Sequence, residues 1–96
     1  MKTLDEIRFL INQDKSKLQK KYPIKRIGIF GSYAYGKPTV NSDVDIIIEL
    51  EEPIGLDFIE LADELEKLIG IKVDLVSANA IKPNMMKYVS ENLVYI

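Results

Sequence analysis

Apolar residues recur at helical spacing along the first part of the chain and predict one face of an amphipathic helix. The positions on this face are Leu4, Ile7, Leu10, Ile11 and Leu18. Thr3 precedes the first turn and Glu6 follows it three residues later, which is the pattern of a capping box. Because the residue before a proline avoids helical backbone, Pro23 ends this helix at or before Tyr22.

Three short apolar runs, at residues 26–30, 43–50 and 71–76, predict strands bounded by glycine, proline and polar residues. Successive side chains of a strand point to opposite faces, so Val44, Ile46 and Ile48 of the second run are expected on one face. The residues expected on the opposite face are Asp43, Asp45, Ile47 and Glu49.

Residues 57–69 and 83–91 predict two further helices, with Gly70 suited to follow the first and Pro83 suited to begin the second. A short helical turn from Gly31 through Tyr35, closed by Gly36, and an apolar tail over residues 93–96 complete the pattern. The wide apolar stripe of the longer helix comprises Phe58, Ile59, Leu61, Ala62, Leu65, Leu68 and Ile69.

The element order αβ(α)βαβα predicts an α/β (α+β) fold. We expect a small mixed β-sheet of three or four strands flanked by helices, in a single domain over residues 1–96. The apolar runs are too short to span a membrane, and the N-terminus carries no signal-peptide pattern, so a cytoplasmic location is expected.

Composition narrows the chemistry that is available. The chain has no cysteine and no histidine, which excludes disulfides, thiolate and histidine metal sites, and imidazole general bases. Catalysis would have to use carboxylates, lysine, tyrosine, serine or a bound metal. The net charge of -2 argues against attraction to a nucleic-acid backbone, so direct nucleic-acid binding is not expected.

Three aspartates on predicted strands are candidate metal ligands. Asp43 and Asp45 are two residues apart on one strand and therefore face the same side, while Asp74 lies on the third strand. Carboxylates gathered in this way would repel each other unless a cation joined them, and magnesium prefers carboxylate and phosphate oxygens. The pattern suits two-metal phosphoryl transfer, in which Asp43 and Asp45 bridge two ions and Asp74 completes the site near the nucleophile.

The Gly31-Ser32 turn is the candidate phosphate site. Glycine exposes bare backbone, serine supplies a hydroxyl, and the start of a helical turn supplies free N–H groups. Each motif alone has an ordinary explanation: a plain turn at Gly31-Ser32, a side-chain-bonded turn at Asp43, or a salt bridge between Asp74 and Lys72. Their combination on three predicted strands favours the functional interpretation.

At these positions the sequence resembles the DNA polymerase β-like nucleotidyltransferase superfamily. The similarity consists of Gly-Ser, ten residues, and then Asp-Val-Asp at 43–45, followed by Val-Asp-Leu at 73–75. In its short length the chain resembles the minimal nucleotidyltransferases (MNT group), which are often antitoxins paired with HEPN-domain proteins. The resemblance implies that Asp43, Asp45 and Asp74 hold two Mg²⁺ ions, with Mn²⁺ an alternative, and that Gly31 and Ser32 bind the phosphates of ATP.

One position departs from the superfamily. Many relatives have Arg where this chain has Tyr35, so a cation near the phosphates is missing, and Lys37 is a candidate to replace it. The simpler interpretation of Tyr33, Tyr35 and Lys37 is loop packing and exposed charge.

The resemblance implies a Mg-dependent transfer of AMP from ATP to a hydroxyl, releasing pyrophosphate, with a tyrosine of a HEPN toxin as the acceptor. Two alternatives remain open: a non-catalytic antitoxin that neutralises by contact, and an aminoglycoside-type nucleotidyltransferase that works with a helical partner. The last helix also predicts a hetero-oligomer, because Met85, Val89 and Asn92 share one side while Met86 and Tyr88 lie off it. Some apolar surface should therefore remain for a partner.

Overall fold

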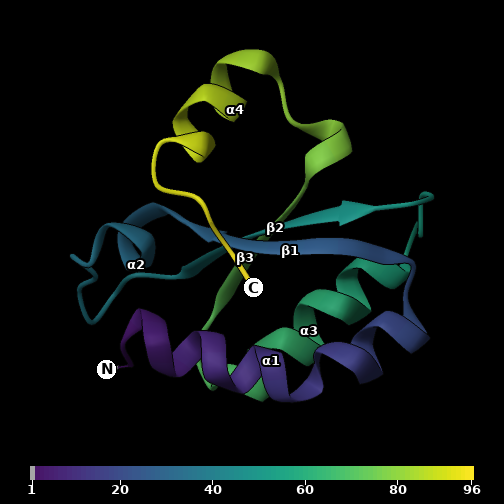
Figure 1. Ribbon diagram of the computed structural model, residues 1–96, viewed down its shortest axis with the longest axis horizontal. Coiled ribbons are helices and arrows are strands. Elements are labelled where there is room, and N and C mark those ends of the chain that lie inside the picture. The colour runs from purple at the N-terminus through teal and green to yellow at the C-terminus, as the bar shows by residue number, and fades with distance from the viewer. Residues whose placement is uncertain (1) are drawn as a thin grey trace.

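A four-stranded mixed sheet with helices on both faces makes up residues 2–96, the part of the chain that the computed structural model describes (Figure 1). In the order β3-β2-β1-β4, β1 runs antiparallel to β2 and β4, whereas β2 and β3 are parallel. The strands are β1 (Ile24–Phe30), β2 (Val44–Leu50), β3 (Val73–Ser77) and β4 (Val94–Tyr95). The predicted fold class, a small mixed sheet flanked by helices, is confirmed.

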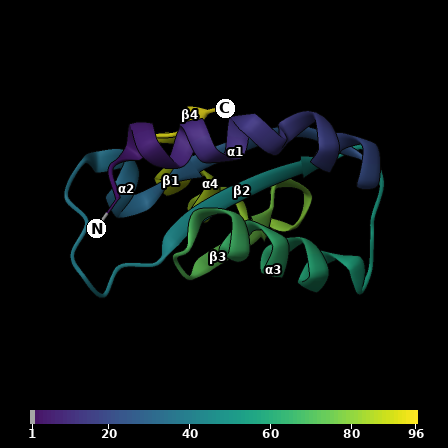
Figure 2. The same ribbon diagram turned by 90° about the horizontal axis from the view of Figure 1, so that it is seen from below.

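The helices divide between the two faces of the sheet (Figures 1 and 2). Two long helices cover one face, α4 covers the other, and the short α2 lies at one end. They are α1 (Leu4–Lys21), α2 (Gly31–Tyr35), α3 (Asp57–Ile69) and α4 (Pro83–Ser90), with a 3-10 turn η1 (Ala78–Ala80) before α4. No helix between residues 2 and 96 is both long and apolar enough to cross a bilayer.

The ends of α1 form as predicted. The Glu6 backbone N–H donates to the Thr3 hydroxyl at 3.2 Å, and the Thr3 N–H donates to the Glu6 carboxylate at 3.1 Å. Tyr22 adopts extended backbone immediately before Pro23. Ile7, Ile11 and Leu18 on this helix are buried against the sheet.

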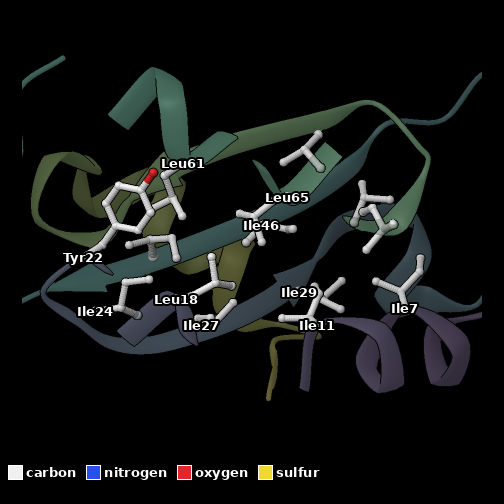
Figure 3. Packing of buried hydrophobic residues seen from close by; sticks show 14 of the residues in the cluster. Ile7, Ile11, Leu18, Tyr22, Ile24, Ile27, Ile29, Ile46, Leu61 and Leu65 are labelled. Carbon is white, nitrogen blue, oxygen red and sulfur yellow. The ribbon is translucent and has the colours of Figure 1, made fainter. Parts of the chain in front are cut away.

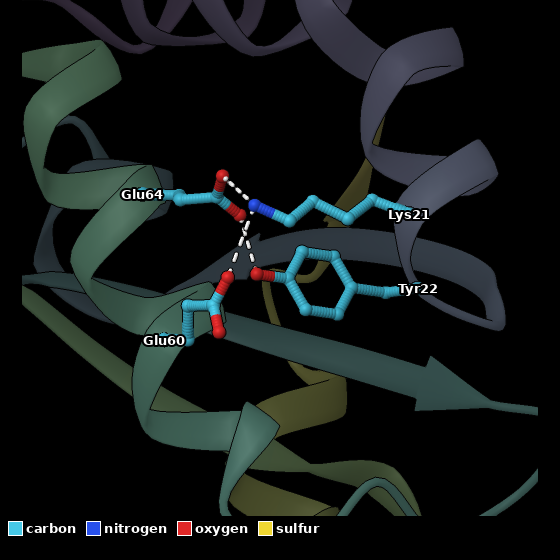
Figure 4. A network of polar contacts seen from close by, with 4 residues as sticks. All are labelled: Lys21, Tyr22, Glu60 and Glu64. Atoms are coloured by element: carbon cyan, nitrogen blue, oxygen red, sulfur yellow. Dashed lines mark hydrogen bonds and ion pairs between the residues drawn. The ribbon is translucent and has the colours of Figure 1, made fainter.

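The main core lies between β1, β2 and the pair of helices α1 and α3 (Figure 3). Alternation along β2 behaves as predicted, since Val44, Ile46 and Ile48 face this core whereas Ile47 faces α4. At the far end of the core, Lys21 bridges Glu60 at 3.0 Å and Glu64 at 2.8 Å, tying α1 to α3 (Figure 4).

Pairing within the sheet corrects three predicted strand boundaries. β1 begins at Ile24 rather than at residue 26, because Ile24 pairs with Leu50 across a register shift. β2 begins at Val44, whose N–H donates to the Lys72 carbonyl at 2.9 Å, so Asp43 precedes the strand. β3 runs over 73–77 instead of 71–76, since β2 offers partners only from Val44 onward.

Two further expectations need correction outside these strands. Ile59 was expected within the stripe of α3, but it is 62% exposed because two residues turn a helix by about 200° away from the buried Leu61. The stretch between the third predicted strand and the last predicted helix contains η1, and the apolar tail becomes β4, which pairs with Gly28 and Ile29 of β1.

The apolar residues of α4 also divide differently from the prediction. Val89 is buried and Met86 packs against the same small cluster, whereas Met85 and Tyr88 are 52% and 46% exposed. Met85 therefore does not share the buried side with Val89. The expectation that some apolar surface remains exposed on this helix is confirmed.

Candidate active site

The predicted site residues gather where β1 ends and where β2 and β3 begin. Phe30, the last residue of β1, pairs with Asp45, and Asp45 pairs in turn with Asp74. Because directly opposed residues of neighbouring strands point to the same face, the Asp45 and Asp74 side chains share the α4 face of the sheet. The fold thus brings together groups from three separate strands at one end of the sheet.

Gly31 and Asp45 are in close contact. Gly31 follows β1 with a φ of +70°, and a Cβ added there would clash with Asp45 Oδ2. Position 31 therefore requires glycine for two independent reasons: its backbone lies in the left-handed region, and the carboxylate fills the space of a side chain.

The turn after Gly31 is the predicted helical turn, α2. Its backbone closes where the Lys37 N–H donates to the Ser32 carbonyl at 3.0 Å and Gly36 adopts left-handed backbone. No side chain caps the first turn of α2, so a phosphate could accept from its N–H groups. Ser32 is half-buried in this turn, whereas the Lys37 side chain is exposed at its far end.

Tyr33 and Tyr35 occupy opposite sides of this turn. Tyr33 is buried in the main core, which confirms the packing interpretation for that residue. Tyr35 is 39% exposed.

The surroundings of Asp45 disfavour the charged form of its carboxyl group. Its burial, the negative charges of Asp74 and Asp43, and a hydrogen bond with Asp74 raise the pKa of Asp45 to about 6 from an ordinary value of 3.8. Asp45 is half-buried, whereas Asp43 and Asp74 are exposed. A cation at this end of the sheet would relieve the repulsion among these three carboxylates.

The donor chemistry suits magnesium, but the ligands are not assembled. All three groups are carboxylates, the oxygen ligands that Mg²⁺ takes together with phosphate. Within residues 2–96, however, no three acidic side chains stand close enough together to hold one ion. Asp74 already lies beside Asp45, so it is the exposed Asp43 side chain that would have to turn toward this pair when an ion binds.

A pair of tyrosines lies beside the carboxylates, and no sequence pattern predicted it. A hydrogen bond with Tyr35 is the main cause that raises the pKa of Tyr88, and the charge of Asp45 adds to it. Tyr88 of α4 and Tyr35 of α2 therefore lie together near Asp45. Tyr35 stood out in the sequence only as a departure from relatives, and nothing in the sequence linked it to Tyr88.

Known proteins resemble this chain along its whole length. A family model described as "Nucleotidyltransferase domain" matches residues 11–96. A Methanocaldococcus jannaschii chain assigned as a protein adenylyltransferase is 48% identical, with all of both chains covered. The protein adenylyltransferase MntA of Thermococcus cleftensis is 41% identical, covering 100% of this chain and 98% of that one.

Solved structures share the fold. A structure assigned as a minimal nucleotidyltransferase superposes with a TM-score of 0.81 at 30% identity, covering 97% of this chain and 95% of the other. A chain from the complex of tri-AMPylated Shewanella oneidensis HEPN toxin with MNT antitoxin gives 0.70 at 22% identity, covering 93% and 70%. At that lower identity the likeness concerns the fold alone.

Proposed function

The chain belongs to the nucleotidyltransferase domain family, and from that premise we propose that it transfers AMP from ATP to a hydroxyl of a partner protein. One observation carries the proposal: Asp45 lies directly against the Gly31 turn and directly beside Asp74. A phosphate held at the turn would therefore adjoin the carboxylates that serve its transfer.

Each residue has a defined part in the reaction. Gly31 lets a phosphate approach the backbone, and the Ser32 hydroxyl donates a hydrogen bond to a phosphate oxygen. Asp43, Asp45 and Asp74 would hold Mg²⁺, which when bound neutralises phosphate charge and activates the attacking oxygen. The exposed Lys37 is the candidate to offset further phosphate charge.

The proposed transfer exchanges one phosphorus–oxygen bond for another. The acceptor oxygen bonds to the α-phosphorus, and the bond from that phosphorus to the bridging oxygen breaks. The electron pair of the broken bond leaves with pyrophosphate. Asp74 accepts the hydroxyl proton and passes it to solvent.

The proposed acceptor is a tyrosine of a HEPN-type toxin, with which the chain forms a hetero-oligomer. Relatives that match the whole chain are named protein adenylyltransferases, and the complex that shares the fold is named for an AMPylated HEPN toxin bound to an MNT antitoxin. AMP on a residue near an RNA site would block and repel RNA phosphates, which suits neutralisation of a ribonuclease. A cytoplasmic location is part of this proposal.

The test is transfer of label from [α-³²P]ATP to the product of the adjacent reading frame, which this proposal expects to be a HEPN-type protein. We expect a labelled tyrosine with Mg²⁺, and loss of label in EDTA or in the double variant Asp43→Asn, Asp45→Asn. Asp63→Asn, an exposed acid on α3, is the matched control and should keep full activity.

The other outcomes separate the alternatives. Full transfer in EDTA, or by the double variant, would contradict the metal-assisted mechanism. Neutralisation of the toxin without ATP would identify a non-catalytic antitoxin. Label on an aminoglycoside instead of protein would identify a small-molecule enzyme.

A further inference from the structure

A groove of about 660 Å³ lies outside the carboxylate site. Consecutive residues of β3, Leu75, Val76 and Ser77, line one part of it. The first turn of α3 contributes Phe58, and the stretch from the end of η1 into the first turn of α4 contributes Ala80, Ile81, Lys82, Asn84 and Met85. The lining is mainly apolar, and of the described residues that line the groove only Lys82 is charged.

The groove lies beside the edge of β3 rather than over one face of the sheet. Side chains of successive strand residues point to opposite faces, so a space that touches three consecutive residues must flank the strand itself. β3 is an outer strand of the sheet, at the margin opposite β4 (Figure 2). α3 and α4 lie on opposite faces of the sheet (Figure 1). Phe58 of α3 therefore lines one wall of the groove, and Asn84 and Met85 of α4 line the other.

The outer edge of β3 carries backbone groups without a strand partner. The Val44 N–H donates to the Lys72 carbonyl, so the N–H and C=O groups of Lys72, Asp74 and Val76 face β2. The N–H and C=O groups of Leu75 and the N–H of Ser77 therefore point outward, toward the groove. The Ser77 carbonyl leads into η1 and accepts from its first turn. Between residues 2 and 96, no backbone hydrogen bond from a turn or loop reaches the N–H and C=O of Leu75 or the N–H of Ser77.

We propose that this groove binds an extended apolar segment of the acceptor protein, which joins the sheet as a fifth strand beside β3. An extended segment offers backbone groups to the edge and alternate side chains to the two walls. A helix satisfies its own backbone and would leave Leu75 and Ser77 unpaired. A second copy of this chain would present its own recessed edge, and two concave surfaces cannot bring their strands within hydrogen-bonding distance.

The position of the groove connects it to the reaction. Asp74 directly precedes Leu75 on β3, so a segment paired with Leu75 and Ser77 continues past the carboxylate site. A hydroxyl a few residues along that segment would reach the α-phosphate. This inference rests on the proposed function for the identity of the acceptor, while the docking itself can be tested separately.

Two substitutions at exposed positions would obstruct the groove without disturbing the core. Ala80→Arg fills it with a long charged side chain, and Met85→Glu places a carboxylate on its apolar wall. Phe9→Glu on α1, where Phe9 is 63% exposed, is the matched control. With the product of the adjacent reading frame as the probe, we expect both groove variants to bind at least tenfold more weakly and the control to bind normally.

ATP binding measured without the partner separates the two proposals. The groove variants should bind ATP within twofold of the original chain. Normal partner binding by both variants would overturn the docking site, whether or not AMP is transferred. Partner binding that is lost only in the groove variants, without AMP transfer by any form, would retain the docking site and overturn the proposed function.

Hydrogen exchange of the β3 amides tests strand addition directly. In the complex, the outward amides of Leu75 and Ser77 should exchange at least tenfold more slowly than in the free chain. Those of Asp74 and Val76, already bonded to β2, serve as internal controls and should change little. A stable complex that leaves Leu75 and Ser77 unprotected would exclude the fifth strand.

Discussion

The two faces of the sheet differ in what they are built to do. The face under α1 and α3 holds the main core, whose residues include the fully buried Ile46, Leu61 and Leu65. The α4 face buries a smaller cluster formed by Phe30, Ile47 and Val89. It also carries Asp45 and Asp74, the proposed catalytic groups. A single strand, β2, supplies both faces by alternation, so one face can stabilise the fold while the other accommodates charge.

Truncating neighbouring residues of β2 should lower the free energy of unfolding by unequal amounts. Ile46→Ala should destabilise the chain by about 2–5 kcal/mol, because it opens a cavity in the main core. Ile47→Ala should cost roughly 2 kcal/mol or less, since α4 can settle toward the sheet. Urea denaturation of both variants measures the difference. Equal losses would mean that the two faces contribute alike to stability.

Much of this division could be predicted from the sequence because it depends on local periodicity. The alternation over residues 44–50 placed Ile46 and Ile47 on opposite faces, and the Gly31 turn and the acids at 45 and 74 followed from short patterns. The interpretation of Asp43 as a strand residue was wrong because the start of β2 depends on pairing with Lys72, which no local pattern records.

Contacts between distant segments could not be predicted in the same way. The apolar tail gave no sign that it would pair with Gly28 as β4, because that pairing depends on where α4 directs the chain. The proximity of Tyr35 and Tyr88 likewise requires α2 and α4 to meet near Asp45. The groove beside β3 exists only once α3 and α4 take opposite faces of an outer strand.

On the α4 face, Ser32→Ala should weaken ATP binding by roughly 0.5–3 kcal/mol, the range for neutral and charge-assisted hydrogen bonds. The fold should be unaffected, because the backbone bonds of α2 do not involve the hydroxyl. Isothermal titration calorimetry with ATP and Mg²⁺ provides the measurement, and Ser90→Ala at the end of α4 is the control. Unchanged affinity would assign Ser32 a structural part in the turn only.

The charge on Asp45 should make metal-free protein less stable as the pH rises. Because the pKa of Asp45 is raised to about 6, the folded state favours its protonated form; this contribution is complete below 3.8 and lost as the pH passes 6. In EDTA, Asp45→Asn should therefore stabilise the chain at pH 8 by about 1 kcal/mol, the full linkage value being reduced because the group is only half-buried.

At pH 3.5 that stabilisation should vanish. Thermal unfolding at both pH values tests the sign, and Mg²⁺ at pH 8 should raise the Tm of the original chain but not that of the variant. A destabilising effect of Asp45→Asn at pH 8 would show that the carboxylate supports the metal-free fold.

The smallest effect is expected at the ion pairs that join α1 to α3. Lys21 bridges Glu60 and Glu64, but its side chain is 52% exposed, so solvent screens both pairs. Lys21→Met keeps the aliphatic stem and removes the charge; it should lower the stability only slightly in low salt and still less in 1 M NaCl. Lys20→Met, at the exposed neighbouring position, is the control for a general change in charge.

A loss of stability that persists undiminished in 1 M NaCl would mean that Lys21 acts through packing against the Tyr22 ring. The centroid of that ring lies 5.6 Å from the Lys21 Nζ. The stability of the α1 and α3 face would then depend on that contact in addition to the apolar core.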